Sequence, residues 1–267
     1  MSPADRILPS DVKKHLSTRR FGRRIYYYPE TDSTNRVALE LAQRGESEGT
    51  VVITDFQTKG EGRQNRTWCG AAGKDLLFTL VLRPDNDVPS MLPVTLVFSA
   101  AVAARLTQSL GIEMGVKWPN DMVTPKGKIG GILAKGSAVP GNPSIVVVGI
   151  GLNVNSDERD FAASIRGRAA SCRTLTGRVW DRGRILADVL DAAEDHYDRF
   201  RKDGFSVLRE HYEEKLALRG QRVYFERGGV RVGGTVEGVN DDGALRLNPA
   251  DGGEPLVLYN EEVRLEP

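Results

Sequence analysis

The sequence predicts an α/β fold followed by a smaller all-β domain. Over most of the chain, apolar runs of strand length alternate with segments of helical periodicity, a pattern typical of α/β proteins. From about Arg219 onward, glycine-rich turn signals separate short strands of alternating hydrophobicity, which is typical of a small β-barrel. We therefore divide the chain into a lead-in (residues 1–24), a main domain (25–217) and a C-terminal domain (218–267).

The α/β pattern begins at Ile25, and a capped helix follows it. Ser33 or Thr34 is suited to cap this helix, residues 37–42 have helical spacing, and Gly45 is suited to end it. Three further helices are predicted in the main domain, at 92–110, 185–200 and 208–216. Its predicted strands are 51–53, 76–82, 116–118, 129–134 and 145–154.

The two ends of the chain differ from this pattern. Residues 1–24 are polar and basic, so we expect a solvated segment with at most one short helix. The C-terminal domain is predicted to contain four strands, 222–226, 230–239, 244–247 and 256–259.

Charge and composition exclude several classes of protein. Lys and Arg number 37 and Asp and Glu 36, and the net charge of 37 − 36 = +1 is too small for a protein that coats a polyanion. The 2 cysteines and 3 scattered histidines predict neither a disulfide framework nor a metal site. No signal peptide and no apolar run of about 18 residues is found, so we expect a cytoplasmic protein with no membrane span.

Common nucleotide-site and hydrolase motifs are also missing. The chain has no P-loop, no dinucleotide fingerprint with three spaced glycines, and no G-x-S-x-G elbow. Glycine-rich and basic segments remain at the predicted strand ends. They favour a small anionic or nucleotide-like ligand held by backbone amides.

Two candidate segments precede the long helix. Segment 31–35 (Thr-Asp-Ser-Thr-Asn) offers hydroxyls and amides that can cap a helix, hold a polar ligand head, or do both. In segment 57–68, glycines let the backbone approach a ligand, Arg63 and Arg66 can pair with phosphate or carboxylate, and Trp68 can stack on a ring. A flexible surface loop is the alternative interpretation of this second segment.

A third segment combines charge with glycine. Asp121 and Lys128 lie on either side of a predicted turn, so they can face each other across a hairpin-like connection and form a compact charge site. A Pro-Asn-Asp turn with exposed lysines is the alternative. That alternative leaves Gly130 and Gly131, inside an apolar strand, unexplained, and such glycines indicate close approach by a ligand or by backbone.

A fourth segment, residues 148–155, contains glycines at alternating positions of a predicted strand. Gly149 and Gly151 leave one face of that strand without side chains. A flat apolar ligand could lie on such a face. A close strand crossing or a bulge is the alternative.

In this order and spacing, the four segments and the final β domain resemble the bacterial biotin protein ligases, also called biotin–[acetyl-CoA-carboxylase] ligases. The resemblance covers about residues 25–267. It implies a mixed sheet flanked by helices, akin to the catalytic core of class II aminoacyl-tRNA synthetases, and an SH3-like C-terminal domain. A homodimer is compatible with it.

The resemblance also implies an ATP-dependent, AMP-forming reaction in two steps. Biotin and Mg²⁺-bound ATP first give biotinyl-5′-AMP and pyrophosphate. The biotinyl group then passes to one lysine of a biotin carboxyl carrier protein of acetyl-CoA carboxylase. ATP and biotin are thus the implied substrates, and Mg²⁺ the implied ion.

Matched positions imply the site residues. Lys128 matches the family's catalytic lysine, Arg63 shares its electrostatic role, and Asp121 matches a residue that assists the acceptor lysine. Positions that match biotin contacts are Ser33, Thr34, Asn35, Gln57, Gly60, Glu61, Gly62, Arg63, Lys128, Gly130, Gly131, Ile132, Leu133, Gly149 and Gly151. Positions that match nucleotide contacts are Arg63, Arg66, Trp68, Lys117, Asn120, Lys128 and Asn153.

The chain departs from the family's usual Gly-Arg-Gly-Arg-x-Gly-Arg loop at two positions. Asn65 replaces a glycine, a mild change because Asn tolerates left-handed backbone. Glu61 replaces an arginine, which reverses a charge beside an anionic ligand. We hypothesise that position 61 contributes mainly its backbone amide, with the side chain turned to solvent.

Three other functions are weighed against biotin ligation. A lipoate–protein ligase would use similar chemistry without this loop, and a non-catalytic biotin or adenylate sensor would bind and not transfer. A nucleic-acid-binding barrel is disfavoured because acidic residues balance its arginines. Only 30 residues precede Thr31, too few for the family's operator-binding winged helix, so we expect no repressor activity and no nucleic-acid partner.

Overall fold

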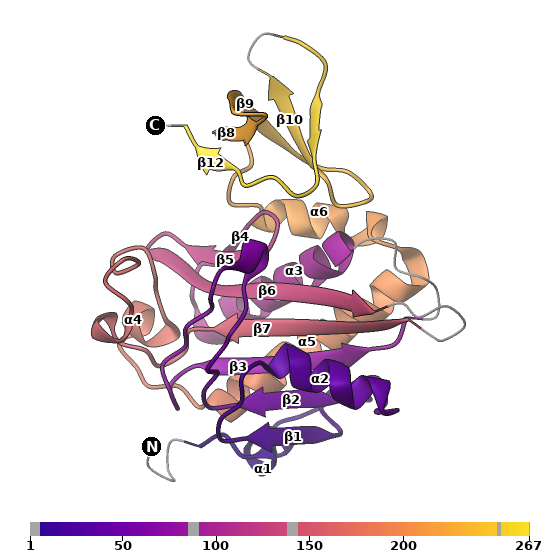
Figure 1. The fold of residues 1–267 in the computed structure, drawn as a ribbon, viewed down its shortest axis with the longest axis vertical. Helices are drawn as coiled ribbons and strands as arrows, with labels where there is room; N and C mark the ends of the chain where they lie inside the picture. Colours follow the sequence, from indigo (N-terminus) through magenta and orange to yellow (C-terminus); the bar gives the residue numbers. More distant parts are fainter. Residues whose placement is uncertain (1–5, 85–90, 138–143, 250–251, 267) are drawn as a thin grey trace.

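The computed structural model describes residues 6–84, 91–137, 144–249 and 252–266. A seven-stranded sheet has the strand order β1-β2-β3-β7-β6-β5-β4, and a five-stranded sheet has the order β11-β10-β9-β8-β12. In the large sheet β1 and β2 are parallel and all other neighbours are antiparallel, so the sheet is mixed as expected. Figure 1 shows the small sheet beyond the β4 edge of the large one, next to α6.

Most strands of the large sheet lie where the apolar runs predicted them. The exceptions are β1, which was noted only as the start of the α/β pattern, and β5, whose first residue belonged to the alternative Pro-Asn-Asp turn. β5 pairs with both β4 and β6. The strands are β1 (Ile25–Tyr28), β2 (Val51–Thr54), β3 (Leu76–Leu82), β4 (Gly115–Lys117), β5 (Asp121–Thr124), β6 (Gly127–Ser137) and β7 (Ile145–Leu152).

Helices cover both faces of this sheet. In Figure 1, α2 lies on the near face, and α3 and α5 lie on the far face. α3 is long and apolar enough to cross a membrane, but it packs against α5 and β6 with most of its side chains buried. The helices are α1 (Pro9–Lys13), α2 (Thr34–Gln43), α3 (Met91–Leu110), α4 (Cys172–Thr176), α5 (Arg182–Asp203) and α6 (Ser206–Lys215), with short 3₁₀ turns at Arg63–Asn65 and Glu158–Asp160.

The expectation of a solvated lead-in is wrong for its described part, from residue 6 onward. Ile7, Val12 and Phe21 are buried in the main core. The Glu194 carboxylate of α5 accepts backbone N–H bonds from residues 19–21, which anchors the segment. Single apolar residues among many arginines and lysines concealed this packing in the sequence. Residues 1–5 lie outside the described residues.

The C-terminal sheet begins four residues after the predicted boundary. Its strands are β8 (Arg222–Arg227), β9 (Val230–Val239), β10 (Leu245–Pro249), β11 (Leu256–Leu258) and β12 (Arg264–Leu265). β12 was not predicted, because two residues carry no periodicity. The domain division and the SH3-like assignment stay predictions.

A buried hydrogen bond joins the two sheets. The Trp118 indole, 2% exposed, follows β4 and donates from Nε1 to the Gly243 carbonyl at 3.0 Å. Gly243 has a φ of +83° and packs against Leu96 of α3. The turn before β10 is therefore held against the main domain.

We predict that Trp118→Phe lowers the free energy of unfolding by about 1–3 kcal/mol, because the Gly243 carbonyl loses its buried donor. Urea denaturation measures the change. Trp180→Phe is the control, since the Trp180 indole bonds locally to Thr176 and is only partly buried. Equal losses in the two variants would contradict the prediction.

Candidate active site

Cross-strand partners place two glycines beside two charged residues on one face of the large sheet. Lys117 of β4 pairs with Asp121 of β5, and Asp121 pairs with Gly131 of β6. Gly131 in turn pairs with Gly151 of β7. Because paired residues point to the same face, this row leaves a flat surface next to a charged edge.

A second row of paired residues lies two positions further along the strands and forms the polar end of the site. Leu133 and Thr79 both pair with Gly149, which again lacks a side chain. Asn35 of α2 fills that space, and a Cβ at Gly149 would overlap its side-chain amide. The helix N-terminus is thereby held against the sheet.

One cavity of about 550 Å³ runs along these rows. Its walls are formed by the start of α2, the loop between β2 and β3, and residues of strands β4 to β7. The segment 161–169 and residues 261–263 complete them. A volume of this size holds a drug-sized ligand.

At the polar end, hydrogen bonds determine the orientation of the Gln57 amide. Its Oε1 accepts from Thr34 N at 2.8 Å and from Thr34 Oγ1 at 3.0 Å. Since a backbone N–H can only donate, Oε1 must be the acceptor, and the Gln57 NH₂ group is left as a donor. Ser33 occupies the N-cap position of α2, but its hydroxyl makes no capping bond.

Thr79 supports this end from the sheet. It is fully buried, and its Oγ1 lies 2.8 Å from Thr34 Oγ1 and 2.7 Å from Asn35 Oδ1. Asn35 also donates from Nδ2 to the Leu133 carbonyl at 3.3 Å. The sequence analysis did not select Thr79, because it lies inside an apolar strand and outside any motif.

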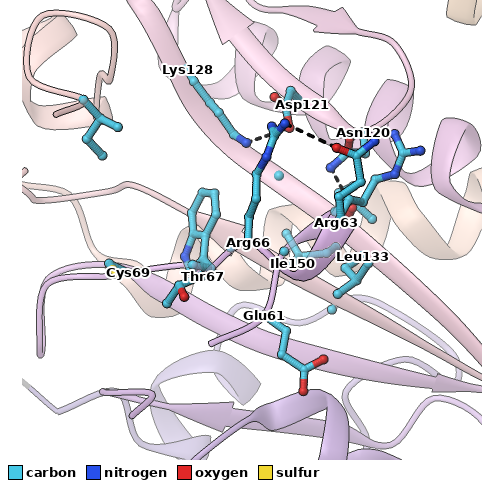
Figure 2. A pocket seen from close by; sticks show the side chains of 18 of the residues that line it. Glu61, Arg63, Arg66, Thr67, Cys69, Asn120, Asp121, Lys128, Leu133 and Ile150 are labelled. Atoms are coloured by element: carbon cyan, nitrogen blue, oxygen red, sulfur yellow. Dashed lines mark hydrogen bonds and ion pairs between the residues drawn. The ribbon is translucent and has the colours of Figure 1, made fainter. Parts of the chain in front are cut away.

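At the other end, the predicted pairing of Lys128 and Asp121 is confirmed. Lys128 Nζ lies 2.6 Å from Asp121 Oδ1 across the β5–β6 hairpin. The same ammonium lies 5.4 Å from the centre of the Trp68 ring, within cation–π range. Figure 2 shows this pair at the cavity wall.

Two loop arginines add positive charge. Arg63 reaches Asn120 Oδ1 at 3.5 Å and the Asn260 carbonyl at 3.4 Å, and makes no ion pair within the described parts of the chain. Burial lowers the pKa of Arg63, but a guanidinium stays charged at neutral pH. Arg66 pairs with Glu262 of the C-terminal segment. The site thus holds a partly buried cation that forms no ion pair with any carboxylate that the structure describes.

Trp68 lies on the glycine surface. A Cβ at Gly151 would overlap its indole, and Gly131 also faces its ring. The Trp68 indole Nε1 is buried without a hydrogen-bond partner among the described residues. An unsatisfied buried donor costs about 1–3 kcal/mol, so an acceptor from a ligand would be favoured there.

The cavity brings together most of the residues that the resemblance implied. Those that line it are Ser33, Thr34, Asn35, Gln57, Glu61, Gly62, Arg63, Arg66, Trp68, Lys117, Asn120, Asp121, Lys128, Gly131, Ile132, Leu133, Gly149, Gly151 and Asn153. Their individual contacts with ligands stay predictions.

Two glycines predicted to contact the ligand lie outside this cavity. Gly130 points to the opposite face, where a Cβ would overlap Met122, because neighbouring strand residues alternate in direction. Gly60 has no side chain because the Trp68 carbonyl and the Gln57 amide occupy that space. It lines a second, open hollow on the outer side of the loop.

The two departures from the usual loop are accommodated. Gln64 and Asn65 have φ values of 53° and 58°, so Asn65 adopts the left-handed backbone that was expected. Glu61 turns away from the Lys128–Asp121 pair (Figure 2) and pairs with Lys135 on β6. Its side chain is 43% exposed, so it is partly solvated and paired rather than free.

Segment 161–169 was missed by the sequence analysis. Phe161 and Ile165 line the cavity, and Arg168 and Ala170 bond to the backbone of Lys128. The available signal was weak: two large apolar residues, four apart, in a connection of alanines, a glycine and polar residues. Spacing alone does not show that this connection folds back against the start of β6, where Ala169 bridges to Lys128.

The chain matches the model of the biotin/lipoate A/B protein ligase family over residues 27–153. It is 30% identical to the biotin–[acetyl-CoA-carboxylase] ligase of Mycobacterium tuberculosis, with 98% of each chain covered. It is 29% identical to the bifunctional ligase/repressor BirA of Bacillus subtilis, covering 96% of this chain and 78% of that protein.

A solved structure agrees with the fold. The biotin protein ligase from Aquifex aeolicus in complex with biotin and ATP superposes with a TM-score of 0.79 at 27% identity. The match covers 91% of this chain and 100% of the other.

We predict that Thr79→Val lowers the free energy of unfolding by about 1–3 kcal/mol, because one buried acceptor, Asn35 Oδ1 or Thr34 Oγ1, loses the single proton that the Thr79 hydroxyl donates. Thr79→Ser keeps the hydroxyl and is expected to retain most of the stability. Chemical denaturation compares the two. A Val variant as stable as the Ser variant would contradict this role.

Proposed function

This chain belongs to the biotin protein ligase family, and from that premise we propose how its cavity carries out ATP-dependent biotin ligation. The enzyme is a biotin–[acetyl-CoA-carboxylase] ligase that takes biotin and ATP as substrates. The observation that supports the proposal best is one cavity with a neutral hydrogen-bonding end and a cationic end. A ureido ring and a phosphate need these two environments.

In the proposed complex, biotin lies on the glycine surface with its head toward α2. The ureido group is neutral and carries both donors and an acceptor. The Gln57 NH₂ group and the free Ser33 hydroxyl can meet those groups. The ring and the valeryl chain then lie along Gly149 and Gly151, so the Trp68 ring, which packs against Gly151, must shift to admit them.

The first step joins two anions. A carboxylate oxygen of biotin attacks the α-phosphorus of ATP, the new P–O bond forms, and pyrophosphate leaves. Lys128, Arg63 and Arg66 supply fixed positive charge where negative charge gathers, which lowers the barrier without covalent catalysis by the protein. Arg66 would exchange Glu262 for phosphate when ATP binds.

The second step transfers the biotinyl group to a lysine of a biotin carboxyl carrier protein, the proposed partner. The lysine Nζ attacks the acyl carbon, the C–N bond forms, and the bond to AMP breaks. Asp121, next to Lys128, would take the proton that the acceptor ammonium must lose. We propose that this occurs in the cytoplasm.

Mg²⁺ enters with ATP in this proposal. Among the described residues no group of three His, Cys, Asp or Glu side chains could enclose a metal ion. Mg²⁺ is commonly held by substrate phosphates with one or two carboxylates. We therefore treat the ion as part of the substrate.

The test is exchange of labelled pyrophosphate into ATP without carrier protein. We predict that exchange requires biotin, is not supported by lipoate, and falls at least about 100-fold in Lys128→Ala, because the cation between the two anions is lost. Lys126→Ala, an exposed lysine on the same hairpin, is the control and is expected to retain activity. Biotin binding without exchange in the wild type would instead indicate a sensor.

Position 61 gives a second prediction. Because Glu61 faces Lys135 and not the proposed phosphate site, Glu61→Arg is expected to change the affinity for biotinyl-AMP by less than about tenfold, since an exposed ion pair contributes little. Titration calorimetry with Glu61→Gln as control measures this. A tenfold or greater tightening would show that the side chain does reach the ligand.

A further inference from the structure

The loop that contributes Gln57 and the two arginines is anchored at both ends by one buried side chain. This loop connects β2 to β3 and runs from Asp55 to Asp75. Arg182, the first residue of α5, donates from Nη2 to Asp55 Oδ1 and from Nη1 to the Asp75 carbonyl, both at 3.0 Å. The guanidinium thus spans the entry and the exit of the loop.

These three residues are almost inaccessible to solvent. Asp55 is 0% exposed, Asp75 2% and Arg182 7%. The other Asp55 oxygen accepts a 2.6 Å bond from the Tyr27 hydroxyl, and Gly73 N bonds to the Asp55 carbonyl at 3.1 Å. Burial and the bond to Asp55 raise the pKa of Tyr27 to about 12, so its hydroxyl remains a donor at neutral pH.

Asp75 extends the anchor to the nucleotide side of the cavity. Its carboxylate accepts bonds from Val154 N at 2.9 Å and from Ser156 Oγ at 2.7 Å. It also accepts from Ala71 N at 2.9 Å, on the loop itself. Val154 directly follows Asn153, which lines the cavity. One carboxylate therefore links the returning arm of the loop to the segment proposed to face adenine.

A buried ion pair is a poor source of stability, since apolar residues of the same volume often serve as well. What such a cluster supplies is a fixed geometry. For a reaction that depends on placement, a shift of about 1 Å can change the rate by about 100-fold. The cluster is outside the cavity lining, so it can act only through the residues it holds.

We infer that Arg182, Asp55 and Asp75 are positioning residues for adenylation, which set where the β2–β3 loop and the segment after β7 meet the ligand. The inference rests on the proposed function. It explains how a 21-residue connection, from 55 to 75, holds its arginines in one place.

The test compares two Arg→Lys variants. In Arg182→Lys one ammonium cannot span both ends of the loop in fork geometry. We expect kcat for pyrophosphate exchange to fall about 10- to 100-fold, with the KM for biotin within about threefold of wild type. Arg105→Lys is the matched control, because Arg105 pairs with Asp188 of α5 away from the loop. It is expected to keep the wild-type kcat.

A second readout does not need activity. Trypsin can cut the loop after Lys59, Arg63 and Arg66, and mass spectrometry follows each cut. Without ligand, Arg182→Lys is expected to be cut in the loop about five times faster than wild type, since its anchored ends loosen. If Arg182→Lys matches Arg105→Lys in both kcat and loop cleavage, the inference is overturned. Absence of biotin-dependent exchange in the wild type would refute the ligase proposal and leave the cleavage test intact.

If Arg182→Lys does not fold, the Ser156→Ala variant tests the inference instead. It removes only the hydroxyl that bonds to Asp75. We expect a several-fold higher KM for ATP with the KM for biotin unchanged, because the segment after β7 is loosened. Ser99→Ala, a buried serine within α3, is the control. An unchanged KM for ATP in Ser156→Ala would overturn the inference.

Discussion

The structure of this site follows from one electrostatic constraint: a carboxylate and a triphosphate must meet in a single small cavity. Two such anions repel strongly once water is removed, so cations have to be in place beforehand. In the proposed mechanism they come from separate elements, Lys128 from the β5–β6 hairpin and Arg63 and Arg66 from the loop after β2. Each is held by a neighbour when no ligand is present, Lys128 by Asp121, Arg66 by Glu262 and Arg63 by neutral oxygens.

The same constraint explains the glycines. Charged groups can converge on a ligand only if the groups around it lie close to the sheet, and the missing side chains of Gly149 and Gly151 let the Asn35 amide and the Trp68 ring approach β7. Trp68 covers this surface, and its indole N–H has no hydrogen-bond partner among the described residues, so it is suited to donate to a ligand. Residues 260–262 also reach the loop arginines, so the C-terminal segment forms part of the site wall.

Sequence reasoning found the parts of the site that depend on spacing within a segment. The Asp121–Lys128 pair and the left-handed Asn65 could be predicted because the turn and the residue type determine them locally. Contacts between distant segments could not be predicted in this way. Arg182 and Asp55 are 127 residues apart, Thr79 lies inside an ordinary apolar strand, and Ile7 and Phe21 are isolated among charges. Gly130 faces away from the cavity, which a Gly-Gly pair in the sequence could not show.

The most direct test of this account is a crystal structure with biotinol-5′-AMP, an unreactive analogue in which a phosphodiester replaces the mixed anhydride. The account predicts the ureido ring beside Gln57 and Ser33, the thiophane ring over Gly149 and Gly151, and the phosphate within hydrogen-bond distance of Lys128 and Arg63. A phosphate bound away from Lys128 and both loop arginines would contradict the claim that converging cations organise this site.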